Sequence, residues 1–381
     1  MKKMNFLAKR RLEAIIFLVL FFAIFGYLAH CMSMNNMLNT IMYTAHDLLL
    51  NTVLYIMGIT VLTGALGKLL TEFGVVRLIE VILRPLMKPL YNLPGVAALG
   101  AVLTFLSDNP AIISLSKEKN FSQYFKKYQI VSLTNFGTAF GMGLVVVAFM
   151  AGKGFGTGAV IGLIGSFVGS IVSTRFMQYF TLKNNPELRD EIVAGGNEQE
   201  ISFKSNGGAF LRGLNAMLDG GKSGVEIGLA IIPGVLIIST FVMILTFGPS
   251  ADGTYTGAAY EGVGLLPFLA GKINIVFEWL FGFTNPELVA FPITSLGAVG
   301  AALGLIPRFI QEGLIDNNAI AVFTAMGMCW SGFLSTHTAM LDSMGYRNLT
   351  SKAILSHFIG GLVAGIVAHW SYVAIAAICG L

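Results

Sequence analysis

The most unusual polar residues of this chain lie inside segments that are otherwise apolar. The stretch TFLSDNPAIISLS, residues 104–116, places Ser107, Asp108 and Asn109 directly before Pro110. An ionised carboxylate in membrane hydrocarbon costs about 3 kcal/mol or more, so such a residue usually faces a cavity or a partner. We expect Ser107 and Asp108 to bind a coupling cation and Asn109 to contact a substrate. The alternative is a purely structural cap on the helix that begins at Pro110.

A second polar stretch, SLTNFGTAFGMG, occupies residues 132–143 and is too polar for a face that contacts lipid. We expect an unwound section whose hydroxyls and carbonyls coordinate Na⁺ or a substrate. Ser132 and Thr134 are assigned to the cation, and Asn135 and Thr138 to the substrate. The alternative is ordinary packing through small residues, with the hydroxyls bonded back to their own helix.

A third polar stretch, FTAMGMCWSGFLSTHTAMLD, occupies residues 323–342. Trp330, Ser331 and Ser335 are expected to contact the substrate. The Trp330 ring either stacks on a planar ligand or fills a gap between helices. We interpret His337 as a hydrated histidine near the inner interface rather than as a proton relay.

The fourth candidate pair, Thr294 and Ser295, lies in the middle of NPELVAFPITSLGAVGAALGLIP, residues 285–307. Helix N-termini at such a break carry free N–H groups and partial positive charge. These suit an anionic or hydrogen-bond-accepting group of a substrate. The alternative is a plain turn.

The composition places all of these residues in a membrane. Of 381 residues, 55% are hydrophobic and 12% are charged, whereas charged residues supply about a quarter of a soluble domain. The longest apolar runs can cross roughly 30 Å of hydrocarbon as helices, and no run alternates like a barrel strand. Cys31, Cys329 and Cys379 have no metal-binding spacing. The sequence predicts an all-α polytopic membrane protein with no metal centre and no cofactor, apart from Na⁺ as a coupling ion.

Seven helices are predicted to span the membrane. All but three of the 24 Lys and Arg residues then fall on the side of the N-terminus, the exceptions being Lys153, Lys272 and Arg308. Because positive charge gathers in cytoplasmic loops, we expect the N-terminus inside and the C-terminus outside. The predicted spans are residues 12–29, 48–67, 128–151, 157–180, 223–247, 319–340 and 353–378.

Four other segments are apolar without reading as simple spans. Residues 68–92 and 264–283 are expected to be interfacial helices. Residues 94–116 and 285–307 each carry a central break, and each half is too short to cross, so we expect re-entrant hairpins. Both halves of the chain show the order span, interfacial helix, hairpin, span, span.

This order predicts an inverted-topology repeat with partly broken spans, an arrangement that places a site at the membrane midplane. Residues 1–47 are expected to form an N-terminal helix and an external loop. Residues 48–180 form the first repeat, residues 181–222 a cytoplasmic linker, and residues 223–381 the second repeat.

Short motifs add a resemblance. LDGGKSGVEIGLAIIPGVLII, residues 218–238, is similar to the Gly-x-Lys-x-Gly and Ile-Ile-Pro pattern of spore-maturation-type membrane proteins. With NLPGVAALG and NPELVAFPITSLGAVGAA, it resembles the nucleoside-recognition, or Gate, domain superfamily, which includes concentrative nucleoside transporters. The resemblance implies a concentrative-transporter-like fold, a site at the hairpin tips and unwound spans, and a homo-oligomer. The residues that contact nucleoside in those carriers find no match here, so the substrate stays open.

We therefore expect a secondary active transporter of a small polar solute, nucleoside-like or another metabolite. It would be coupled to Na⁺ or H⁺ by an elevator-type movement of the hairpins in the cytoplasmic (inner) membrane of a bacterium. Its partners would be the solute and the lipid bilayer, with no nucleic acid. The alternative is a non-transporting membrane protein of assembly or signalling. An enzyme is not expected, because a lone Asp108 supplies no carboxylate dyad and no His-Glu-x-x-His or Gly-x-Ser-x-Gly motif occurs.

Overall fold

The computed structural model describes residues 6–193, 208–250, 252–331 and 335–380. Within these ranges the chain is helical, with no β-strand beyond an isolated bridge between Lys126 and Ile192. The predicted all-α polytopic class is confirmed. Among the described residues, six helical stretches are long and apolar enough to cross a membrane: Lys9–Met32, Met34–Glu72, Lys127–Gly152, Gly156–Asn184, Ala209–Thr246 and Arg347–Cys379.

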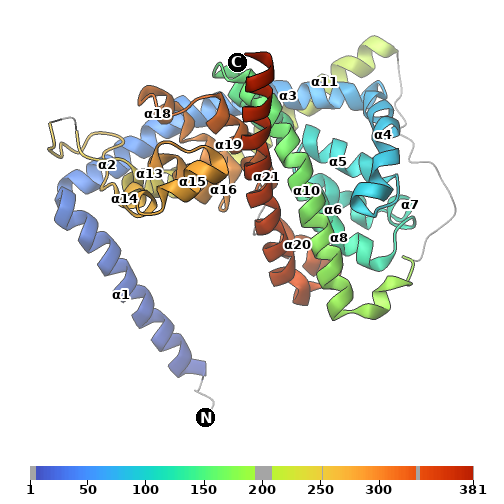
Figure 1. The fold of residues 1–381 in the computed structure, drawn as a ribbon, viewed down its shortest axis with the longest axis horizontal. Helices are drawn as coiled ribbons and strands as arrows, with labels where there is room; N and C mark the ends of the chain where they lie inside the picture. The colour runs from blue at the N-terminus through green and yellow to red at the C-terminus, as the bar shows by residue number, and fades with distance from the viewer. Residues whose placement is uncertain (1–5, 194–207, 251, 332–334, 381) are drawn as a thin grey trace.

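The N-terminal helix stands apart from the rest of the molecule. α1, Phe6–Met32, projects away from the body (Figure 1) and is almost unburied. α2, Met34–Asp47, follows directly, and the Ser33 hydroxyl accepts a hydrogen bond from the Asn36 amide at 3.4 Å. The prediction that residues 1–47 end in an external loop is therefore wrong. A capped helix with its polar residues on one face forms there instead.

Two long helices cross at glycines. α3, Leu54–Glu72, continues from η1, Leu48–Val53, and packs along α11, Ala209–Ala230 (Figure 1). A Cβ added at Gly220 would lie 2.2 Å from the carbonyl oxygen of Gly64. No side chain fits in that space, so glycine permits the backbones to touch, as in other membrane helix pairs.

The predicted linker at residues 181–222 is largely helical where the structure describes it. α10, Gly156–Asn184, extends into it, η3, Pro186–Arg189, follows, and α11 already begins at Ala209. Residues 194–207 lie outside the described part. The polar sequence at the start of α11 marks an exposed helix face, which composition alone does not separate from a loop.

The segment predicted as the first hairpin consists of two short helices. α5, Ala97–Leu106, and α6, Pro110–Lys117, are separated by residues 107–109. Before them, α4, Val75–Leu86, and η2, Met87–Tyr91, carry the amphipathic sequence. The predicted interfacial helix at 68–92 therefore starts later than expected, because residues 68–72 complete α3.

The segment after the first hairpin is interrupted. α8, Lys127–Thr138, ends before residues 139–142, and α9, Gly143–Gly152, begins after them. Met142, directly before α9, has a φ of 55°, a conformation that side chains rarely adopt. The prediction that residues 132–138 are unwound is wrong, since they form regular helix. The break lies one turn later.

A bundle of tightly packed helices forms the centre of the molecule. α10 and α21, Thr350–Cys379, lie side by side between the first-hairpin helices and α13–α16 (Figure 1). A Cβ at Gly169 would lie 2.5 Å from the carbonyl oxygen of Gly360. α19, Asn317–Cys329, packs against both helices. The predicted span at 319–340 is therefore not one helix, because α19 ends at Cys329 and α20, Ser335–Ser343, is separate.

The remaining helices of the second half are short. The predicted interfacial helix at 264–283 divides into two, and the predicted hairpin at 285–307 breaks at residues 296–298. Their bounds are α12 Ile232–Gly234, η4 Val235–Ser239, α13 Thr240–Thr246, α14 Leu265–Gly271, α15 Asn274–Phe281, η5 Pro286–Val289, α16 Ala290–Ser295, α17 Val299–Leu303, α18 Ile306–Gln311 and η6 Arg347–Leu349. In the first half, the short α7, Lys119–Ser122, follows the first hairpin.

Candidate functional site

Three backbone breaks meet at one point. Asn109, at the break between α5 and α6, donates from Nδ2 to the Ser331 hydroxyl at 3.4 Å. Ser331, directly after α19, donates to the carbonyl oxygen of Thr138 at 3.3 Å, at the end of α8. A Cβ added at Gly141, in the break after α8, would lie 2.2 Å from Asn109 Oδ1 and 2.3 Å from Ser331 Oγ. The breaks therefore bring together segments from both halves of the chain.

The first hairpin leaves polar atoms unused at this point. Asn109 is only 4% exposed, and its Oδ1 has no hydrogen-bond partner among the described residues. The same holds for Asp108 Oδ1. Asn109 makes no side-chain capping bond to α6, and Pro110 is the first residue of that helix. An unsatisfied buried acceptor calls for an explanation, and a bound cation or a substrate donor supplies one.

A buried polar network lies next to this meeting point. Asn135 is fully buried and donates from Nδ2 to Ser173 Oγ and to the carbonyl oxygen of Ala353, both at 2.9 Å. Ser173 Oγ lies 3.0 Å from His357 Nδ1, and Thr138 Oγ1 lies 3.4 Å from His357 Nε2. Of the predicted substrate residues, the structure thus links Asn135, Thr138, Asn109 and Ser331 through one continuous set of contacts.

The sequence did not single out His357, which lies at the centre of this network. It stands in an apolar run, and only its contacts reveal it. His337, read as a hydrated histidine, is fully buried, with its ring centroid 4.6 Å from that of His357. That interpretation is wrong, because α20 packs His337 inward against α21.

Trp330 positions the network and is not a free stacking surface. Its Nε1 donates to the carbonyl oxygen of His357 at 3.2 Å, and its ring stacks on Phe358 with centroids 5.6 Å apart and an angle of 7° between planes. A neighbouring apolar cavity of about 450 Å³ is lined by both rings. The packing alternative for Trp330 is the one that the contacts support.

In the part of the chain that the structure describes, the side chains of the other predicted residues make no hydrogen bond to this set, although the Thr134 carbonyl oxygen accepts from the Thr138 hydroxyl at 2.6 Å. Thr294 and Ser295 are buried and bond back to the carbonyl oxygens of their own helix, α16. Ser132, nearer the start of α8, donates to Gln129 O at 2.7 Å. Thr134 is buried, and its Oγ1 has no partner among the described residues. The side chain of Ser335 lies outside what the structure describes.

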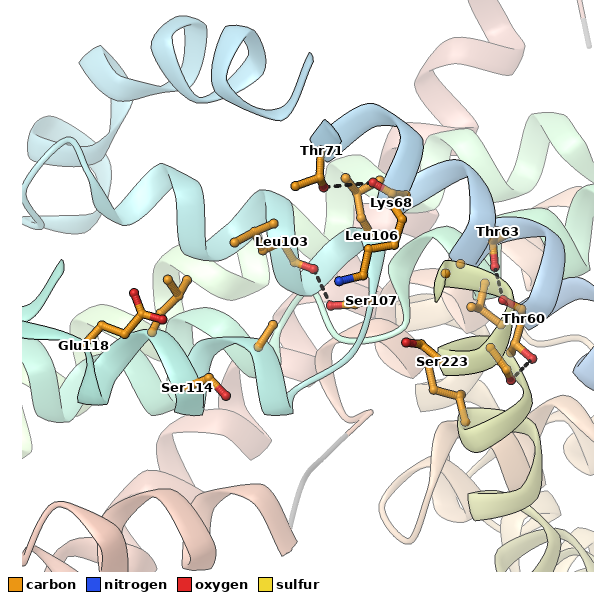
Figure 2. Close-up of a pocket in the computed structure, with 18 residues that line it drawn as sticks. Thr60, Thr63, Lys68, Thr71, Leu103, Leu106, Ser107, Ser114, Glu118 and Ser223 are labelled. Atoms are coloured by element: carbon orange, nitrogen blue, oxygen red, sulfur yellow. Dashed lines mark hydrogen bonds between the residues drawn. The ribbon is translucent and has the colours of Figure 1, made fainter. Parts of the chain in front are cut away.

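Ser107 opens onto a cavity that the sequence did not reveal. The cavity, about 520 Å³, is lined by the first-hairpin helices and by the α3–α11 pair (Figure 2). One wall is a stripe of polar and small residues on α3 with helical spacing, which could have been recognised in the sequence. Its polar lining consists of Thr60, Thr63, Lys68, Thr71, Ser107, Ser114, Glu118 and Ser223.

The fold and the meeting of the breaks define a multi-pass helical membrane protein with the architecture of a known transporter. The concentrative nucleoside transporter CNTnw, in an inward-facing substrate-bound state, superposes with a TM-score of 0.54 at 13% identity. The match covers 84% of this chain and 75% of CNTnw. A CNTnw variant in an outward-facing state gives 0.52 at 12% identity, covering 84% and 76%. At such identity the likeness shows the fold alone.

The sequence comparisons confirm the resemblance to Gate proteins. Residues 53–154 match the Gate family, described as nucleoside recognition, and they include the first hairpin and the break after α8. The chain is 25% identical over 312 residues to an uncharacterized protein of Alkalihalophilus pseudofirmus, covering 77% of this chain and 60% of that protein. It is 27% identical over 128 residues to the sporulation integral membrane protein YlbJ of Bacillus subtilis, covering 32% and 31%. The chain thus spans 60% of the first relative's length and 31% of the second's, less than two thirds of either.

Proposed function

We propose that this protein is a secondary active transporter of a small polar solute, with the solute bound where the three breaks meet. The observation that carries the proposal is the contact of Asn109 and Ser331 across Gly141. Broken helices expose backbone groups inside a membrane only where they line a cavity or a site, so their convergence from both halves favours a binding site.

A nucleoside-like solute fits the chemistry of this site. Asn109 Oδ1 and Asn135 Oδ1 have no partner among the described residues, so they offer neutral acceptors for ribose hydroxyls and base N–H groups. Asp108 adds an acceptor for a ribose hydroxyl or a ligand for a coupling cation. The match of residues 53–154 to the nucleoside-recognition family supports the same class of solute.

An elevator-type movement is supported by the division of the molecule. The backbones of α3 and α11 touch at glycines, whereas a cavity occupies part of the space between this pair and the first hairpin. The hairpins and the central bundle would move as a body against this pair. The inverted repeat, the N-terminus inside, the C-terminus outside and a homo-oligomer in the inner membrane belong to the same proposal.

A counterflow experiment tests this function. Purified protein is reconstituted into liposomes loaded with unlabelled uridine, and uptake of labelled uridine is followed, with adenosine and an amino acid as competitors. We expect transient accumulation that adenosine reduces and the amino acid does not. Uptake equal to that of protein-free liposomes, for uridine and for adenosine alike, would contradict a nucleoside transporter.

A second function has one observation in its favour, the partial match to YlbJ, a protein named for sporulation. A non-transporting role in membrane assembly would need neither a polar meeting point nor a cavity. Because the match covers 32% of this chain, this remains the second candidate.

A further inference from the structure

The central bundle holds two buried histidines whose rings lie against one another. His337 on α20 and His357 on α21 are both buried, with ring centroids 4.6 Å apart and an angle of 64° between planes. Histidine is the side chain whose charge changes near neutral pH. Two imidazoles this close repel one another when both are charged, so the pair holds at most one extra proton at a time.

The hydrogen bonds of His357 fix which nitrogen is open to that proton. Nε2 faces the carbonyl oxygen of Cys329, and a carbonyl only accepts, so Nε2 carries a hydrogen. In the neutral ring Nδ1 then accepts from the Ser173 hydroxyl at 3.0 Å, while Ser173 Oγ accepts from Asn135 Nδ2 at 2.9 Å. All donors in this series of hydrogen bonds point the same way, from Asn135 toward Cys329. The ring nitrogen that can accept an added proton is therefore His357 Nδ1.

A proton added at Nδ1 reverses part of the chain. Nδ1 becomes a donor, and Ser173 Oγ then receives hydrogens from both His357 and Asn135. The Ser173 hydroxyl must turn its own hydrogen to another acceptor. A serine hydroxyl on a helix has the carbonyl oxygen four residues before it as an alternative acceptor, whereas Asn135 Oδ1, which is buried and has no partner among the described residues, stays open to a solute. Protonation thus changes what Asn135 and its neighbour Thr138 present to a solute.

The charged residues of the helices packed around the pair point elsewhere. Lys127 of α8 pairs with Glu191, and Asp342 of α20 pairs with Arg347 at 3.7 Å. Lys352 of α21 lies over the Phe180 ring. On α10, Arg175, Tyr179 and Lys183 are exposed, and on α8 the Tyr128 hydroxyl accepts from Asn92. On α19, Cys329 Sγ lies 3.7 Å from Ser166 O, and on α21 His369 bonds to Asn318, with Tyr372 and Cys379 further toward the end of the helix.

We propose that the His337–His357 pair is the proton-binding site that couples transport to a proton gradient, with Ser173 and Asn135 passing its state to the solute. The proposal rests on the proposed transport function and names H⁺ as the coupling ion. One proton binds at His357 Nδ1 from water and leaves by the same nitrogen. As the N–H bond forms, an O–H bond of the hydronium donor breaks, and the reverse happens when the proton leaves.

The test compares His357→Gln with His369→Gln. Glutamine can keep a donor toward Cys329 O and an acceptor toward Ser173, but it does not titrate. His369, also buried on α21, bonds to Asn318 outside the pair, so its variant is the matched control. In Na⁺-free liposomes with an inward proton gradient of about one pH unit and no membrane potential, one coupled proton supports up to about tenfold uridine accumulation.

We expect uridine uptake by His357→Gln to be the same with and without the proton gradient, and His369→Gln to keep both accumulation and counterflow. Accumulation that survives in His357→Gln and is lost in Asp108→Asn would overturn the proposal, as would accumulation driven by Na⁺ alone. Failure of counterflow in the wild-type protein would instead count against the transport function.

A readout without transport keeps the two questions separate. Nuclear magnetic resonance of protein labelled at histidine follows the protonation of each ring as the pH changes. We expect the signals of His337 and His357 to titrate together with uptake of one proton, and the His337 titration to shift in His357→Gln but not in His369→Gln. Two rings that stay neutral throughout the pH range of the folded protein would refute the site, whatever the solute.

Discussion

Asn109 and Ser331, separated by 222 positions in the sequence, lie 3.4 Å apart from amide to hydroxyl. One residue belongs to the break in the first hairpin and the other follows α19 in the second half. The contact places the break of the first hairpin beside the break that follows α19.

Removing the Asn109 amide should weaken solute binding more than it weakens the fold. Asn109→Ala deletes a donor and an unused acceptor. With about 0.5–1.5 kcal/mol per hydrogen bond, the expected loss in uridine affinity is about two- to tenfold. Binding of labelled uridine to purified protein measures it. Asn39→Ala, at an exposed position on α2, is the control, and equal affinity in both variants would contradict the assignment.

Gly141 should tolerate no side chain in a working protein. In Gly141→Ala the new methyl group pushes aside Asn109 Oδ1 and Ser331 Oγ, both ends of short side chains that can move. We expect counterflow to fall at least about tenfold, with a stability loss of about 1–3 kcal/mol. Gly58→Ala on α3, where a Cβ meets nothing within 4 Å, should retain activity. Activity unchanged at Gly141 would remove this glycine from the site.

The crossing of α3 and α11 should depend on individual glycines. A Cβ at Gly224 would lie 2.3 Å from the carbonyl oxygen of Thr60. A Cβ at Gly221, three positions earlier on α11, would have a methyl group of Val61 as its nearest atom, at 3.6 Å. Gly224→Ala should cost about 1–3 kcal/mol and lower the melting temperature in detergent. Gly221→Ala should be neutral or slightly stabilising. Similar melting temperatures for the two variants would argue against this close crossing.

Glu261 should make the loop between α13 and α14 sensitive to acid. Burial acts to raise the pKa of its carboxylate, but hydrogen bonds from Ser250, Thr256 and Gly257 outweigh burial, so the pKa lies below its usual range. A pKa lowered by folding stabilises the protein above the unfolded value of about 4.3, and this contribution is lost as the pH falls through the folded value.

We expect Glu261→Gln to lower the melting temperature at neutral pH and to flatten its fall in acid. Melting temperatures measured from neutral pH down to about pH 3, below the unfolded pKa of glutamate, provide the test. Glu226→Gln, an exposed acid on α11, is the control. Equal acid dependence in wild type and Glu261→Gln would rule out this role for the loop.

The sequence predicts the class of fold and the positions of the helix breaks better than the lengths of the helices. The sequence Ser107-Asp108-Asn109-Pro110 predicts a break, because proline has no backbone N–H to donate to a preceding turn and the polar residues interrupt an apolar run. The polar sequence of α2 reads as a loop, because Asn and Met residues give no strong signal until Ser33 is seen to cap a helix.

Some residues of the candidate site could be predicted from the sequence and others could not. Asn109, Asn135 and Ser331 stand out because polar residues are rare in apolar segments. His357 does not, because its meaning lies in contacts with Ser173 and Cys329, which are 184 and 28 positions away. Thr294 and Ser295 look similar to the true neighbours, yet their hydroxyls bond to their own helix.

The central claim is that Ser331 lies in a site that opens to each side of the membrane in turn. A two-cysteine variant, in which Ser331→Cys joins the buried Cys329 after Cys31→Ser and Cys379→Ser, is treated with a membrane-impermeant maleimide from each side separately, and the same background without Ser331→Cys is the control. We expect the maleimide to label the cysteine at position 331 from both sides of the membrane, and uridine to slow the labelling. No labelling from either side, in a variant that folds like the wild-type protein, would contradict it and favour a membrane protein that does not transport.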